Sequence, residues 1–228
     1  LSCLADMNNR IAELYQKHHA EKERFGFTLF EAERSGWLTS QFPKKEGLRV
    51  LDLGCRDATL MRHYAPLAST LVGVDIDPSA VAEAKKRLPQ AEIFQMDLLG
   101  DWSELQGRQF DVIACSEVLE HVYYPRQVAE KVANLLAPGG IFIGTIPNAF
   151  FLKHRLRYLF GLRNGTPMSD PTHITQFNVQ ELKRVLSVIS NEITISGYTR
   201  KPLGWLAEKC PSLFAFDVYF CVKKHQNV

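Results

Sequence analysis

The stretch Val50-Leu51-Asp52-Leu53-Gly54-Cys55-Arg56-Asp57-Ala58-Thr59-Leu60, followed by Val72-Gly73-Val74-Asp75, decides the fold of this chain. An apolar run ends at Gly54, a polar turn follows, and a second apolar run ends at Asp75. Open α/β folds hold the ribose of a nucleotide-like cofactor with such a unit, in which a carboxylate ends the second strand. The stretch therefore predicts an α/β domain that binds a nucleoside.

Length, charge and composition fit one α/β domain and exclude several classes of protein. The chain has 228 residues and a net charge of +2, which is too small to indicate a nucleic-acid partner. No apolar run reaches the roughly 18 to 20 residues that cross a bilayer, and the first residues do not resemble a signal peptide. The five cysteines lack metal-site spacing and are expected to be reduced. We expect a cytoplasmic protein, and its oligomeric state stays open.

Strand-like apolar runs alternate with amphipathic helical segments through most of the chain. The predicted strands are residues 48–53, 70–75, 91–95, 110–115, 139–146, 192–196 and 214–222, and the predicted helices are 4–40, 58–66, 78–88, 101–106, 125–136 and 179–190. Asp77 is the expected cap of the third of these helices, with Pro78 at its first position. This alternation predicts a parallel sheet with helices on both faces. The last two strands are expected to pair as a hairpin at one edge, the second antiparallel to the rest.

Polar groups follow consecutive predicted strands at their carboxyl ends. They are Asp52-Leu53-Gly54, Asp75, Asp97 and Ser116-Glu117. Each alone fits a helix cap or a turn residue equally well. Ligands of open α/β sheets lie beyond the carboxyl ends of the strands, so the four together indicate a nucleoside site.

The glycine pattern decides which nucleoside is expected. A dinucleotide fold needs G-x-G-x-x-G to bring the pyrophosphate against backbone amides, and here Arg56 and Thr59 stand at two of the glycine positions. No Gly-Lys-Ser/Thr follows the strand either, so a P-loop is absent. A nicotinamide-dependent oxidoreductase is therefore excluded.

The ordered motifs resemble those of class I S-adenosylmethionine-dependent methyltransferases of the type 11, 12 or 23 kind, in the small-molecule O-methyltransferase branch. The matching motifs are Asp52-x-Gly54, Asp75, Asp97, the run from Phe110 to Val122, and Leu136-Ala137-Pro138-Gly139-Gly140. The resemblance implies a Rossmann-like, mostly parallel sheet of seven strands in the order 3-2-1-4-5-7-6, with strand 7 antiparallel and helices on both faces. It implies a single domain over 1–228, with an N-terminal helical cap (1–44), a cofactor-binding core (45–146), a lid or insert (147–178), and a C-terminal helix and strand hairpin (179–228).

The same resemblance makes S-adenosyl-L-methionine the cofactor. The residues implied to bind it are Asp52, Gly54, Cys55, Asp75, Ile76, Asp97, Leu98, Ser116 and Glu117. Asp75 would bind the ribose, Asp97 the adenine amine, and Gly54 would let the backbone approach the methionyl part. Arg56 and Ala58 depart from the family pattern, since a left-handed φ would cost arginine about 1 kcal/mol or more. Whether this turn still admits the cofactor closely enough for transfer is the main question that the sequence raises.

Two histidines are candidate catalytic bases, because a hydroxyl acceptor gains from a base during methyl transfer. His121 follows the fourth strand and His173 lies on the segment expected to cover the acceptor; the alternative is that both only pack and order their loops. Glu117, Glu120 and His121 form E-x-x-E-H, which in some quinone and small-RNA methyltransferases holds a divalent metal, with His173 as a possible fourth ligand here. Because the same sequence is widespread in members without a known metal role, we expect no metal.

Residues 150–163 mix apolar and basic side chains at helical spacing and are expected to form a lid helix. Its basic face suits an anionic group on the substrate or an anionic membrane surface, and a merely solvated face is an equal alternative. We predict methyl transfer to a small or medium acceptor, at a hydroxyl oxygen of a glycan, a lipid-linked precursor or a quinone-like phenol. The alternative is a methyltransferase-like binding partner with little catalysis, similar to proteins of bacterial methionine biosynthesis.

Overall fold

A computed structural model describes most of the chain. The described residues are 13–14, 16–17, 25–26, 28–200 and 204–225. Residues 4–12, 15, 18–24 and 27 of the predicted helix 4–40 therefore lie outside the described residues, as does Cys3.

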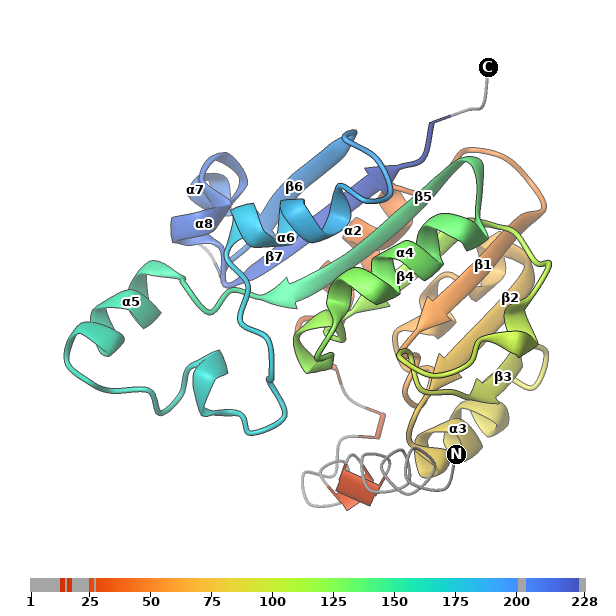
Figure 1. Ribbon diagram of the computed structural model, residues 1–228, viewed down its shortest axis with the longest axis horizontal. Helices are drawn as coiled ribbons and strands as arrows, with labels where there is room; N and C mark the ends of the chain where they lie inside the picture. The colour runs from red at the N-terminus through yellow and green to blue at the C-terminus, as the bar shows by residue number, and fades with distance from the viewer. Residues whose placement is uncertain (1–12, 15, 18–24, 27, 201–203, 226–228) are drawn as a thin grey trace. The chain divides into compact units, whose positions relative to one another are not determined.

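Seven strands form one sheet in the order β3-β2-β1-β4-β5-β7-β6 (Figure 1). They are β1 (Leu48–Leu53), β2 (Ala68–Asp75), β3 (Glu92–Gln95), β4 (Phe110–Ser116), β5 (Leu136–Pro147), β6 (Ile193–Tyr198) and β7 (Asp217–Lys223). Strand β1 pairs in parallel with β2 and β4, and β2 pairs in parallel with β3. Strand β7 pairs antiparallel with both β5 and β6. The predicted fold class is confirmed, including the late antiparallel hairpin.

Seven α-helices and five short 3₁₀ turns connect the strands in the described part of the chain. The α-helices are α2 (Glu31–Ser40), α3 (Pro78–Arg87), α4 (Pro125–Leu135), α5 (Leu152–Leu159), α6 (Val179–Leu186), α7 (Gly204–Lys209) and α8 (Pro211–Phe214). The 3₁₀ turns are η1 (Met61–His63), η2 (Ala65–Leu67), η3 (Ser103–Leu105), η4 (Leu119–His121) and η5 (Pro167–Ser169). Asp77 caps α3 as predicted, since its carboxylate accepts a hydrogen bond from the Ser79 amide at 2.8 Å.

Three predicted helices are wrong in part. Residues 58–66 form the turns η1 and η2 rather than a helix, because Ala58 has a φ of 60° and Pro66 cannot donate a helical hydrogen bond. Residues 101–106 contain only the single turn η3. In the last part of the predicted helix 4–40, helix α2 begins only at Glu31. Phe30 has a φ of 55°, and a helix cannot continue through that conformation.

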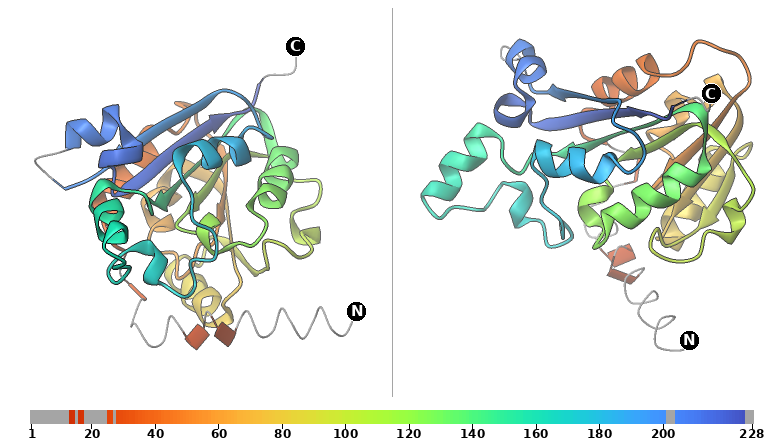
Figure 2. Two further views of the ribbon diagram at one scale, coloured as in Figure 1. Left: turned by 60° about the vertical axis from the view of Figure 1, so that its left-hand side comes forward. Right: turned by 45° about the horizontal axis from the view of Figure 1, so that its top comes forward.

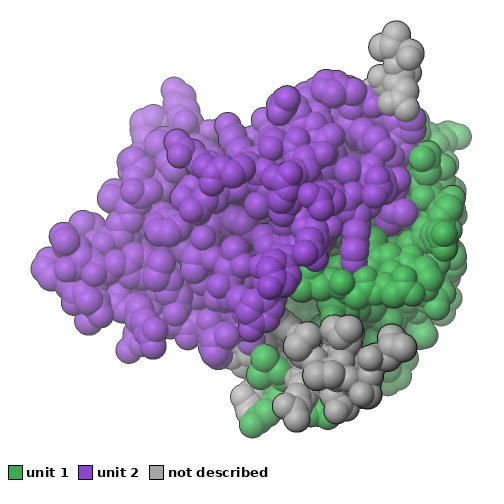
Figure 3. Space-filling view, viewed as in Figure 1, with its two compact units in different colours: residues 1–114 green, residues 115–228 purple. Residues whose placement is uncertain are grey.

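The chain divides into two compact units, residues 1–114 and 115–228 (Figure 3). In the first unit, every residue of strand β1 except Arg49 is buried, and Val50, Leu51 and Leu53 are fully inaccessible to solvent. In the second unit, Phe142 of β5 packs on Phe220 of β7 with ring centroids 5.2 Å apart. The finer predicted division at 44, 146 and 178 stays a prediction.

Within the second unit, helices α4 and α6 pack together, and α7 and α8 pack on β6 (Figures 1 and 2). Helix α5 packs at its start on Phe216, directly before β7, since the Phe151 and His154 ring centroids lie 6.2 and 6.0 Å from that of Phe216. Strand β5 lies so close to the end of β4 that a side chain at Gly144 would place its Cβ 1.8 Å from the Cys115 carbonyl oxygen. This contact fixes the end of β4, where the chain leaves the sheet toward its candidate catalytic residues.

Candidate functional site

In the first unit, β1 and β2 end side by side and the chain turns immediately after β1. Leu53 is paired with Val74, and the next amide, that of Gly54, donates to the Val74 carbonyl at 2.8 Å. Gly54 has a φ of 72°, which glycine adopts at little cost. Cys55 turns inward, since a Cβ on Gly73 would lie 2.9 Å from its sulfur. Burial and then the charge of Asp75 raise the pKa of Cys55, so its thiol stays neutral.

Asp75 ends β2 with its carboxylate held in a fixed orientation. One oxygen accepts the amide of Arg56 at 2.8 Å, and the other accepts the amide of Asp77 at 2.9 Å. Each carboxylate oxygen has further acceptor capacity. The two amides therefore hold the Asp75 carboxylate in one orientation at the end of β2, the place where open α/β folds bind the ribose of a nucleotide-like cofactor.

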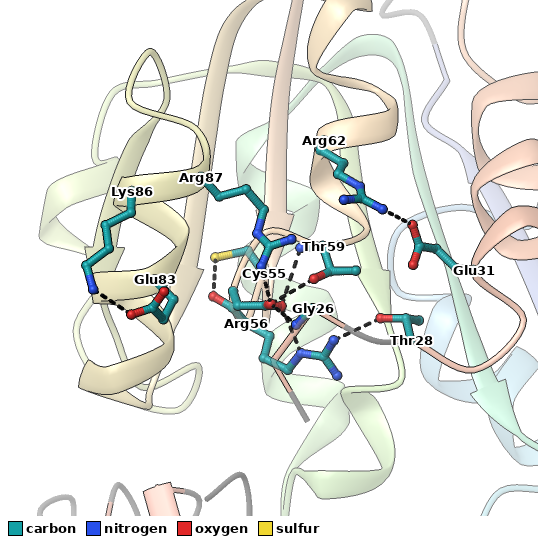
Figure 4. A network of polar contacts seen from close by, with 11 residues as sticks. Gly26, Thr28, Glu31, Cys55, Arg56, Thr59, Arg62, Glu83, Lys86 and Arg87 are labelled. Atoms are coloured by element: carbon teal, nitrogen blue, oxygen red, sulfur yellow. Dashed lines mark hydrogen bonds and ion pairs between the residues drawn. The ribbon is translucent and has the colours of Figure 1, made fainter. Parts of the chain in front are cut away.

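Two residues of the turn after β1 have a left-handed backbone conformation, which costs free energy for residues other than glycine. Arg56 has a φ of 49° and Ala58 a φ of 60°. The Arg56 side chain bonds to Asp57 and to the Thr28 hydroxyl, at 3.1 and 2.9 Å (Figure 4). The side chain in place of glycine is thus directed to other protein groups, and the residues of this turn fit a nucleoside cofactor.

Asp52 lies beneath this turn and bonds to a residue that sequence reasoning missed. The Tyr64 hydroxyl donates to the Asp52 carboxylate in the core. Burial raises the pKa of Asp52 to about 7, the charge of Asp75 adds to this, and the Tyr64 hydrogen bond opposes it. The only signal for Tyr64 in the sequence is an aromatic residue at helical spacing within residues 58–66. The structure does not form the helix that this spacing predicted.

We expect the buried Asp52 to make stability fall with rising pH. Between about pH 4 and pH 7 the folded protein keeps a proton on Asp52 that the unfolded chain releases, so raising the pH favours unfolding. The expected loss is a few kcal/mol, since one pKa unit corresponds to about 1.4 kcal/mol. Urea unfolding of the wild type and Asp52→Asn at several pH values measures it. The difference in the free energy of unfolding between the two proteins should change across this range. A constant difference for Asp52→Asn would contradict the raised pKa.

Asp97 follows β3 next to the end of β2. The Met96 amide donates to the Asp75 carbonyl at 2.8 Å, and the Asp97 carboxylate accepts the Leu99 amide at 2.9 Å. Leu98 is buried, while Ile76 is partly exposed. The structure thus brings Asp52, Gly54, Asp75 and Asp97 to neighbouring strand ends in the first unit, as predicted.

In the second unit, Ser116 ends β4 and Glu117 makes a strained turn. Glu117 has a φ of 58°, and its amide donates to the Thr145 carbonyl at 2.8 Å. Its carboxylate accepts the Thr145 hydroxyl at 3.0 Å. Glu117 is therefore directed to β5.

The two candidate bases lie next to each other. Thr175 holds their segments together, because its amide donates to the Glu120 carbonyl and its hydroxyl to the Val122 carbonyl, both at 2.8 Å. The rings of His121 and His173 meet edge to face with centroids 4.8 Å apart. Nδ1 of His121 lies 2.8 Å from the Thr172 carbonyl oxygen, which only accepts, so Nδ1 carries the proton. Nε2 is then the basic nitrogen.

Ligand atoms of Glu120, His121 and His173 lie within 4.8 Å of one another and have the chemistry to hold a metal ion. His121 Nε2 is 3.8 Å from the Glu120 carboxylate. Glu117 of the E-x-x-E-H sequence is absent from this group, since it bonds to Thr145. One carboxylate and two imidazoles suit a transition metal better than magnesium. The expectation that no metal binds stays a prediction.

Comparison with known proteins identifies the family. A family profile described as a methyltransferase domain matches residues 18–187. The chain belongs to the methyltransferase domain family. It is 28% identical over 149 residues to a protein of Mycolicibacterium smegmatis named as a probable S-adenosylmethionine-dependent methyltransferase, covering 64% of this chain and 53% of that one. The predicted class I family and its cofactor, S-adenosylmethionine, are thereby confirmed.

Two further methyltransferases are similar over different lengths. The ubiquinone biosynthesis O-methyltransferase of Aeromonas salmonicida is 32% identical over 126 residues, covering 52% of this chain and 53% of the relative. The crystal structure of magnesium protoporphyrin IX methyltransferase from Synechocystis, with bound S-adenosylhomocysteine, is 17% identical with a TM-score of 0.65 and covers 95% of this chain and 99% of its own. The chain spans about half the length of the two curated relatives. The likeness to the solved methyltransferase supports the fold.

Proposed function

We propose that this methyltransferase domain transfers a methyl group from S-adenosylmethionine to a hydroxyl oxygen of a small or medium-sized acceptor. The observation that carries the proposal is the orientation of His121, whose Nδ1 donates to the Thr172 carbonyl, so that Nε2 is the basic nitrogen. A hydroxyl acceptor must lose a proton, and a positioned imidazole can take it. The name of the relative from Aeromonas salmonicida, a ubiquinone biosynthesis O-methyltransferase, agrees with oxygen as the acceptor atom.

The proposed roles follow the geometry of each unit. The residues proposed to hold the cofactor are Asp52, Gly54, Cys55, Asp75, Ile76, Asp97, Leu98, Ser116 and Glu117. Bound there, the cofactor supplies an electrophilic methyl group, and the protein mainly aligns the reactants. Asp75 accepts the ribose hydroxyls, and Asp97 accepts the adenine amine. His121 receives the acceptor's proton at Nε2 as the oxygen gains the methyl group, and His173 orients the His121 ring through its edge.

Transfer to a panel of acceptors tests this proposal. The protein is incubated with methyl-labelled S-adenosylmethionine and a catechol, an alkyl hydroquinone, a monosaccharide or a primary amine. We expect a methyl ether from at least one hydroxyl compound. We expect no N-methylated product from the amine. Methylation of nitrogen alone would contradict the oxygen assignment. Cofactor binding without transfer to any hydroxyl compound would instead favour a methyltransferase-like binding partner.

We also propose that α5 and the residues after it contact an anionic membrane surface. The helix buries His154, whose Nδ1 bonds to the Asn148 carbonyl at 3.0 Å, and turns large apolar side chains outward. Leu156, Leu159 and Phe160 are 53%, 76% and 75% exposed. Four basic residues accompany them (Lys153, Arg155, Arg157 and Arg163), and no acidic residue occurs between 147 and 169. Apolar side chains among basic ones suit the interface of an anionic bilayer.

Among the described residues, no helix is long and apolar enough to cross a membrane. A cytoplasmic location stays a prediction.

Sedimentation with lipid vesicles tests this contact. We expect the protein to sediment with phosphatidylglycerol vesicles and to remain in solution with phosphatidylcholine vesicles, since basic residues add about 1 kcal/mol each near an anionic surface. The double substitution Leu159→Ser with Phe160→Ser should lower binding at least about tenfold through the lost apolar burial. Tyr123→Ser, at another exposed aromatic residue of the same unit, is the control. Equal sedimentation of both variants would exclude α5 as the contact.

A further inference from the structure

Asp57 gathers several donors beside the cofactor turn although it is wholly buried. Its carboxylate accepts from Arg56 Nε at 3.1 Å, Arg87 Nη2 at 3.0 Å, Thr59 Oγ1 at 2.7 Å and the Gly26 amide at 2.6 Å (Figure 4). Burial by itself would raise the pKa of Asp57, but the hydrogen bonds of Gly26 and Thr59 and the charge of Arg56 outweigh burial and lower it. Asp57 is therefore a charged centre that joins three separate segments of the first unit.

The Arg56 side chain is held at both ends of its guanidinium group. Nε bonds to Asp57, and Nη2 donates to the Thr28 hydroxyl at 2.9 Å. Two guanidinium groups thus meet at one carboxylate, because Arg87 reaches it from the last turn of α3. Charge-assisted bonds of this kind are stronger than neutral ones and define direction.

The backbone of Arg56 needs such a restraint. Its φ of 49° lies in the left-handed region, which only glycine enters without cost. In this conformation the Arg56 amide reaches the Asp75 carboxylate at 2.8 Å. A residue that relaxed to a right-handed or extended conformation would withdraw this donor and change the orientation of Asp75.

We propose that Arg56 and Asp57 are positioning residues of the cofactor site: the tether of Arg56 to buried Asp57 and Thr28 holds the Arg56 backbone in the left-handed conformation from which its amide orients Asp75. This inference rests on the proposed cofactor site. The tether takes the place of the glycine or other small residue that the family pattern has at position 56. Its action is indirect, through the backbone and Asp75.

A pair of substitutions at Arg56 separates this role from a direct contact. Arg56→Ala removes the tether and keeps a Cβ, so its affinity for S-adenosylhomocysteine should fall about fivefold to tenfold, the factor that corresponds to the usual left-handed cost. Arg56→Gly removes the tether and also the need for it, so its affinity should return to within about twofold of the wild type. Calorimetry with S-adenosylhomocysteine measures both. Asp57→Asn, which loses the charge but keeps the shape, should behave like Arg56→Ala.

Hydrogen exchange of the amide at position 56 gives a second readout that does not need the ligand. We expect faster exchange in Arg56→Ala and protection restored in Arg56→Gly. The Leu88 amide, which donates to the Ala84 carbonyl, should exchange at the wild-type rate in both variants. Equal losses of affinity in the alanine and glycine variants would overturn the inference, because they would mean that the guanidinium contacts the ligand. Wild-type exchange in Arg56→Ala would overturn it as well. A wild-type protein that binds no S-adenosylhomocysteine contradicts the proposed function, and the exchange readout still decides on the tether.

Discussion

Asp75→Ala should lower the affinity for S-adenosylhomocysteine at least about a hundredfold. Hydrogen bonds to a charged group contribute about 1.5–3 kcal/mol each, and two ribose hydroxyls would lose theirs together. The variant also removes the acceptor of the Arg56 and Asp77 amides, so the turn loses its shape. Calorimetry measures the affinity, and thermal unfolding shows whether the variant is folded.

Two comparisons make this result specific. Asp75→Asn keeps the size of the side chain and one acceptor oxygen, so we expect an intermediate loss. Asp101→Ala is the control, because exposed Asp101 likewise accepts a backbone amide, that of Ser103 at 3.1 Å, away from the strand ends. Unchanged affinity in a folded Asp75→Ala would remove Asp75 from the cofactor site.

His121→Asn should reduce the rate of methyl transfer to a hydroxyl acceptor by about 10²- to 10⁴-fold, the usual contribution of a general base. Asparagine keeps a donor near the position of Nδ1 that can still bond to the Thr172 carbonyl, while the basic Nε2 is lost. The affinity for S-adenosylhomocysteine should stay within about twofold of the wild type, because the substitution removes a group that acts on the acceptor during transfer and not on the bound cofactor. Single-turnover kinetics and calorimetry measure the two effects separately.

The neighbouring histidine and a distant one serve as comparisons. His173→Phe replaces the imidazole with a slightly larger ring that has no nitrogens and can still pack against His121, so we expect a loss of no more than about tenfold, the upper end of an aromatic contact. His63→Asn, in the first unit, should leave the rate unchanged. Full turnover in His121→Asn would exclude it as the base. Wild-type activity that is lost in a chelator and restored by a divalent ion would assign Nε2 to a metal instead.

The sheet and the cofactor half of the site could be predicted because they depend on local patterns. Parallel strands are buried on both faces and leave continuous apolar runs, and the polar residue that ends each run marks the ligand edge. The bounds of β1 agree with the predicted 48–53 at both ends. An antiparallel β7 was expected because the two late strands could pair as a hairpin at one edge, and the family resemblance added the order of the strands.

The connections could not be predicted because tertiary contacts decide them. Residues 58–66 have helical spacing, but the positive φ of Ala58 and the bonds that Asp57 makes with Thr59 leave only two 3₁₀ turns. Helices α7 and α8 are too short for periodicity to indicate. Asp57 and Tyr64 have no motif of their own. Asp57 bonds to Arg87 and Tyr64 bonds to Asp52 only because the folded chain brings these residues together.

The left-handed turn at Arg56 has a consequence for how this sequence can change over evolution. With glycine at position 56, neither Asp57 nor Arg87 is needed to hold the backbone, and both positions are free to vary. With arginine there, the acid that follows it and the arginine on α3 become a matched set. Homologues are therefore expected to exchange these three residues together, so that correlated substitution at 56, 57 and 87 records whether a chain shapes its turn with glycine or with a buried ion cluster.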